Sequence, residues 1–187
     1  RYLTKIINHF PNLRIVLEHI TSAVAVKFIE ENKNIAATIT NHHLMVNRNI
    51  MLSKGIRPDF YCAPILKTEY DRCALVKAAT SGNSKFFLGT DSAPHVAGKK
   101  IASCGCAGIF SSPLAIPLLI QLFEEHSSLE KIEPFMSRNG RAFYGLRQHK
   151  DRVRYVKRSK SIEVIKDIKT SNGKMTVFNP YGEIFWE

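Results

Sequence analysis

Residues 86–95 read FFLGTDSAPH, a short apolar run that leads into Gly89, Thr90 and Asp91. Such a run is typical of a buried parallel strand, because polar side chains in these sheets gather just beyond the carboxyl ends of the strands. A carboxylate at that depth is costly unless it is hydrogen-bonded, paired or bound to metal. Asp91 is therefore a candidate catalytic residue and metal ligand, and the alternative is an aspartate that caps the next turn.

Two further apolar runs alternate with segments of helical spacing. The predicted strands are residues 14–19, 35–40 and 86–88, and the predicted helices are residues 22–31 and 70–80. The segment 41–67 has no sustained period and is expected to be a long loop with brief ordered pieces, and later helices are expected over residues 113–126 and 129–136. This alternation indicates an α/β fold with parallel strands and right-handed crossovers.

The first run ends in His19, which parallel pairing would bring to the same rim as Asp91. A neutral imidazole can bind zinc, although an isolated buried histidine is more often structural. Imidazole and carboxylate together favour a metal-dependent hydrolase, since both suit a divalent ion that activates water. Two ligands do not complete such a site, because catalytic zinc usually has three protein ligands and a water.

Length and composition favour a single globular domain. The 187 residues are 44% hydrophobic and 23% charged. A complete (β/α)8 barrel typically needs about 250 residues, so the chain is short for that fold. The sequence has no run of about 18 apolar residues, which argues against a membrane span. Four cysteines are too few for a disulfide framework, which favours a reducing, cytoplasmic compartment.

Other histidine and cysteine pairs carry weaker signals. Cys104 and Cys106 have no second close pair, so a zinc ribbon is not favoured. The adjacent His42 and His43 would point in opposite directions on a strand, and we interpret them as loop residues with poor geometry for chelating one ion. Motifs of P-loop, dinucleotide-binding, HExxH and GxSxG proteins are absent from the sequence.

The formal net charge of +11 is concentrated near the C-terminus. Residues 138–174 contain twelve Lys or Arg against three Asp or Glu. Such an excess favours anionic partners, but this segment lacks the interleaved aromatic residues of a recognisable RNA-binding motif. We interpret it as a solvated basic surface, and nucleic acid is not the expected partner.

Several longer strings resemble the second half of the single-function bacterial and plant type of dihydroorotase. They are LEHIT (17–21), AATIT (36–40), HLMVNRN (43–49), YCAPILK (61–67), FLGTDSAPH (87–95), SCGCAG (103–108) and NGRAFYGL (139–146). The resemblance covers residues 14–146 well and the basic tail only loosely. It implies part of a (β/α)8 barrel (TIM barrel) of the amidohydrolase superfamily, with residues 1–146 in the barrel and residues 147–187 as a basic extension packing on it.

The resemblance also implies an activity and a site. Dihydroorotases interconvert N-carbamoyl-L-aspartate and L-dihydroorotate in de novo pyrimidine synthesis, with two zinc ions bridged by hydroxide and a carboxylated lysine. Carried over, His19 is a ligand to one zinc, and Asp91 is a ligand to the other and the proton shuttle. His95 and the backbone at Ala107 bind the carboxylate side of the substrate, and the backbone at Ala63 holds the pyrimidine ring.

The remaining ligands of that family have no counterpart here. The His-x-His pair of the first strand is absent from the sequence, and the bridging lysine, a further histidine and the mobile loop all precede the matched region. We therefore expect a fragment that begins in the helix before the sixth strand and is inactive alone. The parent protein is expected to be a cytoplasmic homodimer, with an organelle left open. The alternative is a non-catalytic barrel remnant that acts as a scaffold.

Overall fold

Three short parallel strands form the centre of the fold. The computed structural model describes residues 2–187 and places β1 (Ile15–Leu17), β2 (Ile35–Ile39) and β3 (Phe86–Leu88) in the order β1-β2-β3. Ala37 of the central strand lies opposite Leu17 on one side and Phe86 on the other. All five residues of β2 are buried, as expected of a strand flanked on both edges and covered on both faces. The three predicted strands and their parallel pairing are confirmed.

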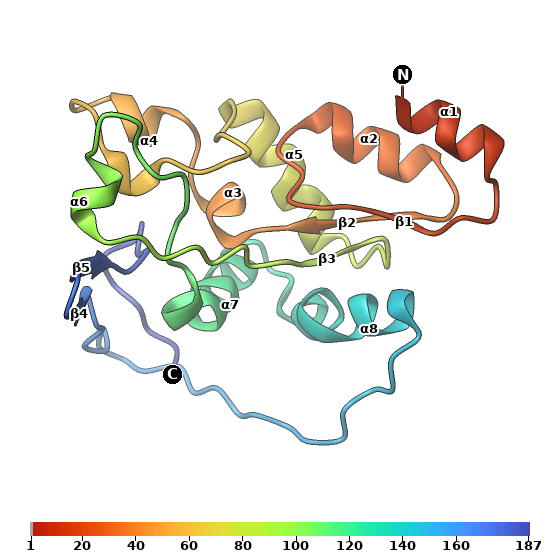
Figure 1. Ribbon diagram of the computed structural model, residues 1–187. Helices are drawn as coiled ribbons and strands as arrows, with labels where there is room; N and C mark the ends of the chain where they lie inside the picture. The colour runs from red at the N-terminus through yellow and green to blue at the C-terminus, as the bar shows by residue number, and fades with distance from the viewer. Residues whose placement is uncertain (1) are drawn as a thin grey trace.

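Helices cover both faces of this sheet (Figure 1). They are α1 (Tyr2–His9), α2 (Ala23–Glu31) and α5 (Glu69–Thr80) on one side, and α7 (Ala115–Glu125) and α8 (Asn139–Tyr144) on the other. Ser22 caps α2 by accepting the backbone N–H of Ala25, and Thr68 and Asp71 form a capping box at the start of α5. Asp71 also accepts the N–H of Ala23, so this carboxylate joins the beginnings of α2 and α5.

The segment between β2 and α5 contains three short helices, α3 (Asn41–Met45), α4 (Asn49–Leu52) and η1 (Pro58–Phe60). The prediction of brief ordered pieces is confirmed, but the interpretation of His42 and His43 as loop residues is wrong. Both lie in α3 and are buried. The physical reason is that Thr40 caps a helix directly after β2, and Leu44 draws that helix into the core.

The helix predicted over residues 129–136 is broken into two elements. A 3-10 turn, η3 (Leu129–Lys131), is followed by a π-helical turn, η4 (Pro134–Arg138), which continues into α8. Pro134 has no backbone N–H, so regular α-helical hydrogen bonding cannot pass through it. The shorter α6 (Ala97–Lys100) and η2 (Ser112–Leu114) lie between β3 and α7.

The C-terminal segment returns to the core after an extended stretch that follows α8 (Figure 1). It contains an antiparallel hairpin, β4 (Asp167–Thr170) and β5 (Gly173–Thr176). Val177 pairs with Phe110, and Ile184 is fully buried in the hydrophobic core. The chain beyond residue 176 therefore packs into the core, whereas the Lys and Arg side chains of residues 138–174 are exposed, apart from the half-buried Arg141.

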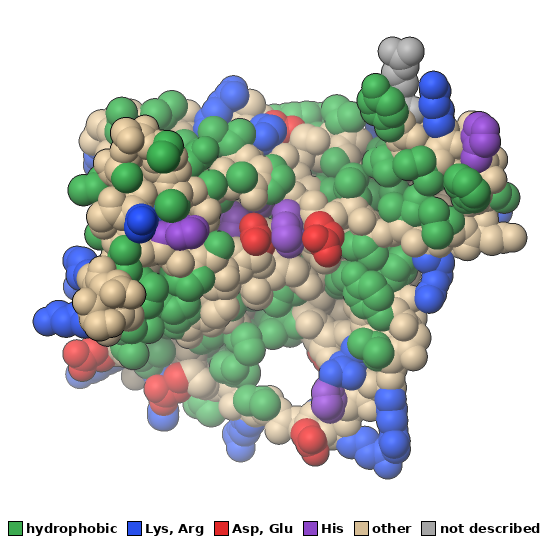
Figure 2. Space-filling view, viewed as in Figure 1, with side chains coloured by type: hydrophobic (Ala, Val, Ile, Leu, Met, Phe, Trp, Pro, Cys, Tyr) green, Lys and Arg blue, Asp and Glu red, His purple; other side chains and the backbone are tan. Residues whose placement is uncertain are grey.

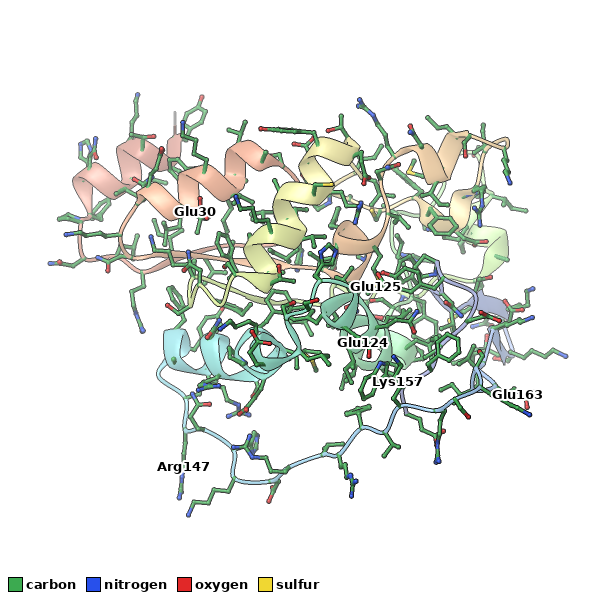
Figure 3. The ribbon with its side chains drawn as sticks, turned by 180° about the vertical axis from the view of Figure 1, so that it is seen from behind. Glu30, Glu124, Glu125, Arg147, Lys157 and Glu163 are labelled. Atoms are coloured by element: carbon green, nitrogen blue, oxygen red, sulfur yellow. The ribbon has the colours of Figure 1, made fainter. Side chains whose placement is uncertain are left out.

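Glu124 of α7 fixes the extended stretch to the helical layer. Figure 3, which views the molecule from behind, shows Lys157 beside Glu124, and the two charged groups lie 2.7 Å apart. The indole N–H of Trp186 donates to the other carboxylate oxygen of Glu124.

Within residues 2–187, no helix combines the length and the apolar character needed to cross a membrane.

Replacing Gly89 by alanine tests how closely the chain packs at the end of β3. A Cβ at this position would lie 2.6 Å from the Cβ of Thr38, whereas a Cβ at Gly98 in α6 would meet nothing within 4 Å. We expect Gly89→Ala to lower the free energy of unfolding by about 1–3 kcal/mol because the crowded strand must shift. Gly98→Ala is the matched control and should be neutral or stabilise the protein by up to about 1 kcal/mol. Urea unfolding of both variants measures the difference, and equal effects would contradict this packing.

Candidate functional site

His19 and Asp91 lie side by side just beyond the carboxyl ends of β1 and β3. The Nδ1 atom of His19 is 3.8 Å from the Oδ2 atom of Asp91, and the side chains are 24% and 31% exposed. Figure 2 shows acidic and histidine side chains gathered near the centre of this face. Within the described part of the chain, neither side chain has a hydrogen-bond partner, so ligand atoms of both remain free.

The backbone conformation at both residues is unusual. His19 has φ of 51° and Asp91 has φ of 43°, the left-handed region that non-glycine residues seldom adopt. Such a conformation costs on the order of 1 kcal/mol or more and persists only where the surroundings impose it. For His19 the surroundings are visible, because its N–H donates to the Thr38 hydroxyl at 2.7 Å. Two strained residues at the ends of the strands that flank β2 mark this rim as the candidate site.

His95 and Ala107 lie together in the loops beyond β3. The Nε2 atom of His95 is 3.1 Å from the carbonyl oxygen of Ala107, and because a carbonyl only accepts, Nε2 carries the proton. Gly108 leaves room for this approach, since a Cβ there would lie 2.9 Å from the Cδ2 atom of His95. The structure thus brings together two of the three predicted substrate-binding positions.

Lys100, which the sequence analysis did not single out, connects these loops to the segment that carries the third position, Ala63. The Lys100 side chain is buried, and its Nζ donates to the carbonyl oxygens of Tyr61 and Gly108 at 2.8 and 2.5 Å. Burial lowers the pKa of this amine below its usual range. The lysine ties the segment carrying the exposed Ala63 to the segment carrying Ala107.

A separate group of buried side chains that can bind metal includes the cysteine next to Ala63 in the chain. It consists of His42, His43 and Cys62, whose ligand atoms all lie within 4.8 Å of one another. The sequence interpretation of His42 and His43 as poor chelators is wrong, because a helix rather than a strand carries them and turns both rings toward the same cysteine. Among residues 2–187 this is the only such group of three or more.

The strand-end pair fits part of a metal centre. The imidazole of His19 and the carboxylate of Asp91 are donors that suit zinc, and both are partly exposed with free ligand atoms. Within the described residues they have no third ligand beside them. The pair therefore offers two of the three protein ligands that catalytic zinc usually has.

Comparisons with known proteins relate the chain to named dihydroorotases. No protein-family model matches the chain. The dihydroorotase of Nitrosococcus oceani is 57% identical over 157 residues, which is 83% of this chain and 46% of that protein. The dihydroorotase of a Ruegeria species is 44% identical over 187 residues, which is 100% of this chain and 54% of that protein. The chain spans about half the length of the curated relatives it matches.

A solved structure shows the same relation in three dimensions. The crystal structure of dihydroorotase from Saccharomyces cerevisiae, in complex with 5-fluoroorotic acid, matches with a TM-score of 0.85 and 34% identity. The match covers 99% of this chain and 54% of that one. The fold is thus that of part of an amidohydrolase-type TIM barrel. The chain's curated homologues are dihydroorotases, so the resemblance carried by the sequence motifs is confirmed.

Replacement of Lys100 tests the link between the loops. Lys100→Met removes a charged donor and leaves two carbonyl oxygens without it, so we expect the free energy of unfolding to fall by about 1.5–3 kcal/mol. Lys99→Met, at the exposed neighbouring position, is the control and should stay within about 0.5 kcal/mol of the parent. Chemical denaturation of the two variants decides the matter, and a Lys100→Met variant as stable as the parent would show that the link contributes nothing.

Proposed function

We propose that this chain supplies about half of a dihydroorotase, the enzyme that reversibly cyclises N-carbamoyl-L-aspartate to L-dihydroorotate in pyrimidine (UMP) biosynthesis. The observation that carries the proposal is the pair of free ligand side chains, His19 and Asp91, 3.8 Å apart at the ends of β1 and β3. The identity to named dihydroorotases over the strand ends and the loops around them supports it.

In the proposed site His19 would hold one zinc ion and Asp91 the other. Bound there, zinc lowers the pKa of a coordinated water toward neutrality and polarises the amide carbonyl of the substrate. Asp91 accepts a proton from the attacking water during ring opening and returns it to the leaving ring nitrogen. Its partial exposure suits this role, since a carboxylate that exchanges protons with substrate must be reachable from the open face.

The proposed substrate contacts come from the loops that Lys100 links. The backbone at Ala63 and Ala107 offers amide groups on two sides of the rim, and Ala63 is exposed. The ring of His95 is oriented by its hydrogen bond to the Ala107 carbonyl, and the proposed contact with the carboxylate of the substrate requires a proton on Nδ1 as well, because a carboxylate only accepts. Fixed loops favour catalysis because they hold the substrate in place without a further entropic cost.

A grafted enzyme tests the proposal. In the Ruegeria dihydroorotase, the segment that matches this chain over 187 residues would be replaced by the chain itself. We expect the graft to hydrolyse dihydroorotate, and Asp91→Asn to lower kcat by about 100-fold to 10,000-fold, the range for loss of a general acid–base residue. Asp151→Asn, in the exposed tail, is the matched control and should leave kcat unchanged. A folded graft without activity, or an active Asp91→Asn variant, would contradict the assignment.

The isolated 187-residue chain is expected to have no measurable dihydroorotase activity, even in zinc-containing buffer. The reason is that His19 and Asp91 supply only two of the ligands that a catalytic zinc usually has. Steady-state assays with dihydroorotate, run beside the active graft, provide the measurement. Hydrolysis by the isolated chain, together with zinc near two equivalents per chain, would overturn this expectation.

A further inference from the structure

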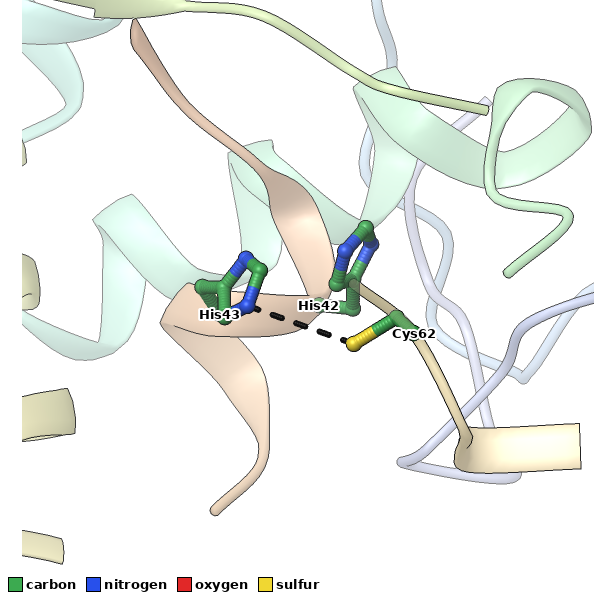
Figure 4. Close-up of side chains that lie close together, drawn as sticks. All are labelled: His42, His43 and Cys62. Carbon is green, nitrogen blue, oxygen red and sulfur yellow. Dashed lines mark hydrogen bonds between the residues drawn. The ribbon is translucent and has the colours of Figure 1, made fainter. Parts of the chain in front are cut away.

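His42, His43 and Cys62 form a buried cluster that the proposed chemistry does not use. The two histidines come from α3 and the cysteine follows η1, and Figure 4 shows the three side chains converging. Their exposed fractions are 0%, 2% and 2%. Their ligand atoms all lie within 4.8 Å of one another, so a modest contraction would bring them around one ion.

His42 is the unusual member of the cluster, because both of its ring nitrogens are buried and lack a hydrogen-bond partner within residues 2–187. The ring packs edge-on against Phe178 and lies 4.6 Å from the ring of His43. Burial holds the pKa of His42 well below its usual range, so the ring is neutral and keeps one free lone pair. A buried polar side chain without a partner calls for an explanation such as an ion.

The ring of His43 is held in place at both of its nitrogens. Its Nδ1 lies 2.7 Å from the Thr40 hydroxyl and its Nε2 lies 2.9 Å from the carbonyl oxygen of Pro64. Because that carbonyl only accepts, Nε2 carries the ring proton and Nδ1 accepts from Thr40. The hydroxyl can equally accept, so the proton can move to Nδ1 and free Nε2 while the ring stays fixed.

The cluster does not suit a nucleophilic role. The Cys62 sulfur is 4.0 Å from Nε2 of His43, and its thiol donates to the carbonyl of Pro64 instead. Desolvation raises the pKa of this thiol to about 11, whereas a catalytic cysteine has a depressed pKa. A coordinated cation, in contrast, displaces the thiol proton outright. One thiolate and two imidazoles form a donor set that suits zinc among the common divalent ions.

We propose that His42, His43 and Cys62 bind one zinc-type cation in a second metal site, separate from the pair His19 and Asp91. On binding, the cation takes the lone pairs of His42, of Nε2 of His43 and of the Cys62 sulfur. The thiol proton of Cys62 is released to solvent, and the ring proton of His43 moves from Nε2 to Nδ1, facing the Thr40 hydroxyl.

A cation in this site would make the segment around Ala63 more rigid. Cys62 and Pro64 flank Ala63, and both contact His43. A cation bound to His43 and Cys62 would therefore restrict the movement of the segment that carries Ala63. Lys100 holds the same segment at the carbonyl of Tyr61. The role is structural, since the ligands are buried.

Cobalt titration of the 187-residue chain tests the proposal, because a cysteine ligand gives cobalt a thiolate charge-transfer band. The parent for the test carries Cys73→Ser, Cys104→Ser and Cys106→Ser, which leaves Cys62 as its single thiol. We expect the band to reach saturation at one cobalt per chain. His42→Gln in this background should weaken cobalt binding by at least about 100-fold, since even outer-shell changes cost about 10-fold to 100-fold.

The controls separate this site from the rest of the chain. His126→Gln, at an exposed histidine, should leave the cobalt affinity unchanged. The double variant His19→Gln with Asp91→Asn should retain the band, so failure of the proposed enzyme function would not affect this result. No band in the folded parent, or a His42→Gln variant that binds cobalt within threefold of the parent, would overturn the proposal. Circular dichroism establishes that each variant is folded.

Discussion

The arrangement of the site depends on Thr38, the buried threonine in the central strand. Its hydroxyl accepts the N–H of His19, its carbonyl accepts the N–H of Ile20, and its side chain fills the space that a Cβ at Gly89 would need. A single residue of β2 therefore fixes the chain beyond β1 and the chain beyond β3. His19 contacts Thr38 through its own backbone N–H, and Asp91 follows two residues after Gly89, which packs against the Thr38 side chain. These contacts with one residue keep His19 and Asp91 close together.

Around this centre, the loops are fixed by polar groups rather than by apolar packing alone. Lys100 joins the carbonyls of Tyr61 and Gly108, and His43 contacts Pro64 from below. Loops at the rim of a parallel sheet cannot use the sheet's own hydrogen bonds, so side chains must supply them. Lys100 and His43 are buried polar side chains, and their hydrogen bonds to loop carbonyls hold the loops at the open face in one conformation.

Much of the fold could be predicted from the sequence, because its signals are local. Short apolar runs mark β1, β2 and β3, and the caps at Ser22 and Thr68 mark the helix starts. His19 and Asp91 could be found because they lie within three residues of the ends of such runs. Lys100 and the buried group around His42 could not be found, since their partners lie far away in the chain and adjacent lysines or histidines look alike in sequence. The π-helical turn at Pro134 could not be found either, because the spacing of apolar residues predicts a helix without showing which hydrogen-bonding pattern it has.

The proposed function requires His19 and Asp91 to be ligands of one metal centre, brought together by the ends of β1 and β3. Zinc-edge anomalous diffraction from crystals of the grafted enzyme measures this most directly. We expect anomalous peaks within about 2.2 Å of a His19 ring nitrogen and of an Asp91 carboxylate oxygen. A zinc-loaded, active graft in which every peak lies beyond coordination distance of these two side chains would contradict it.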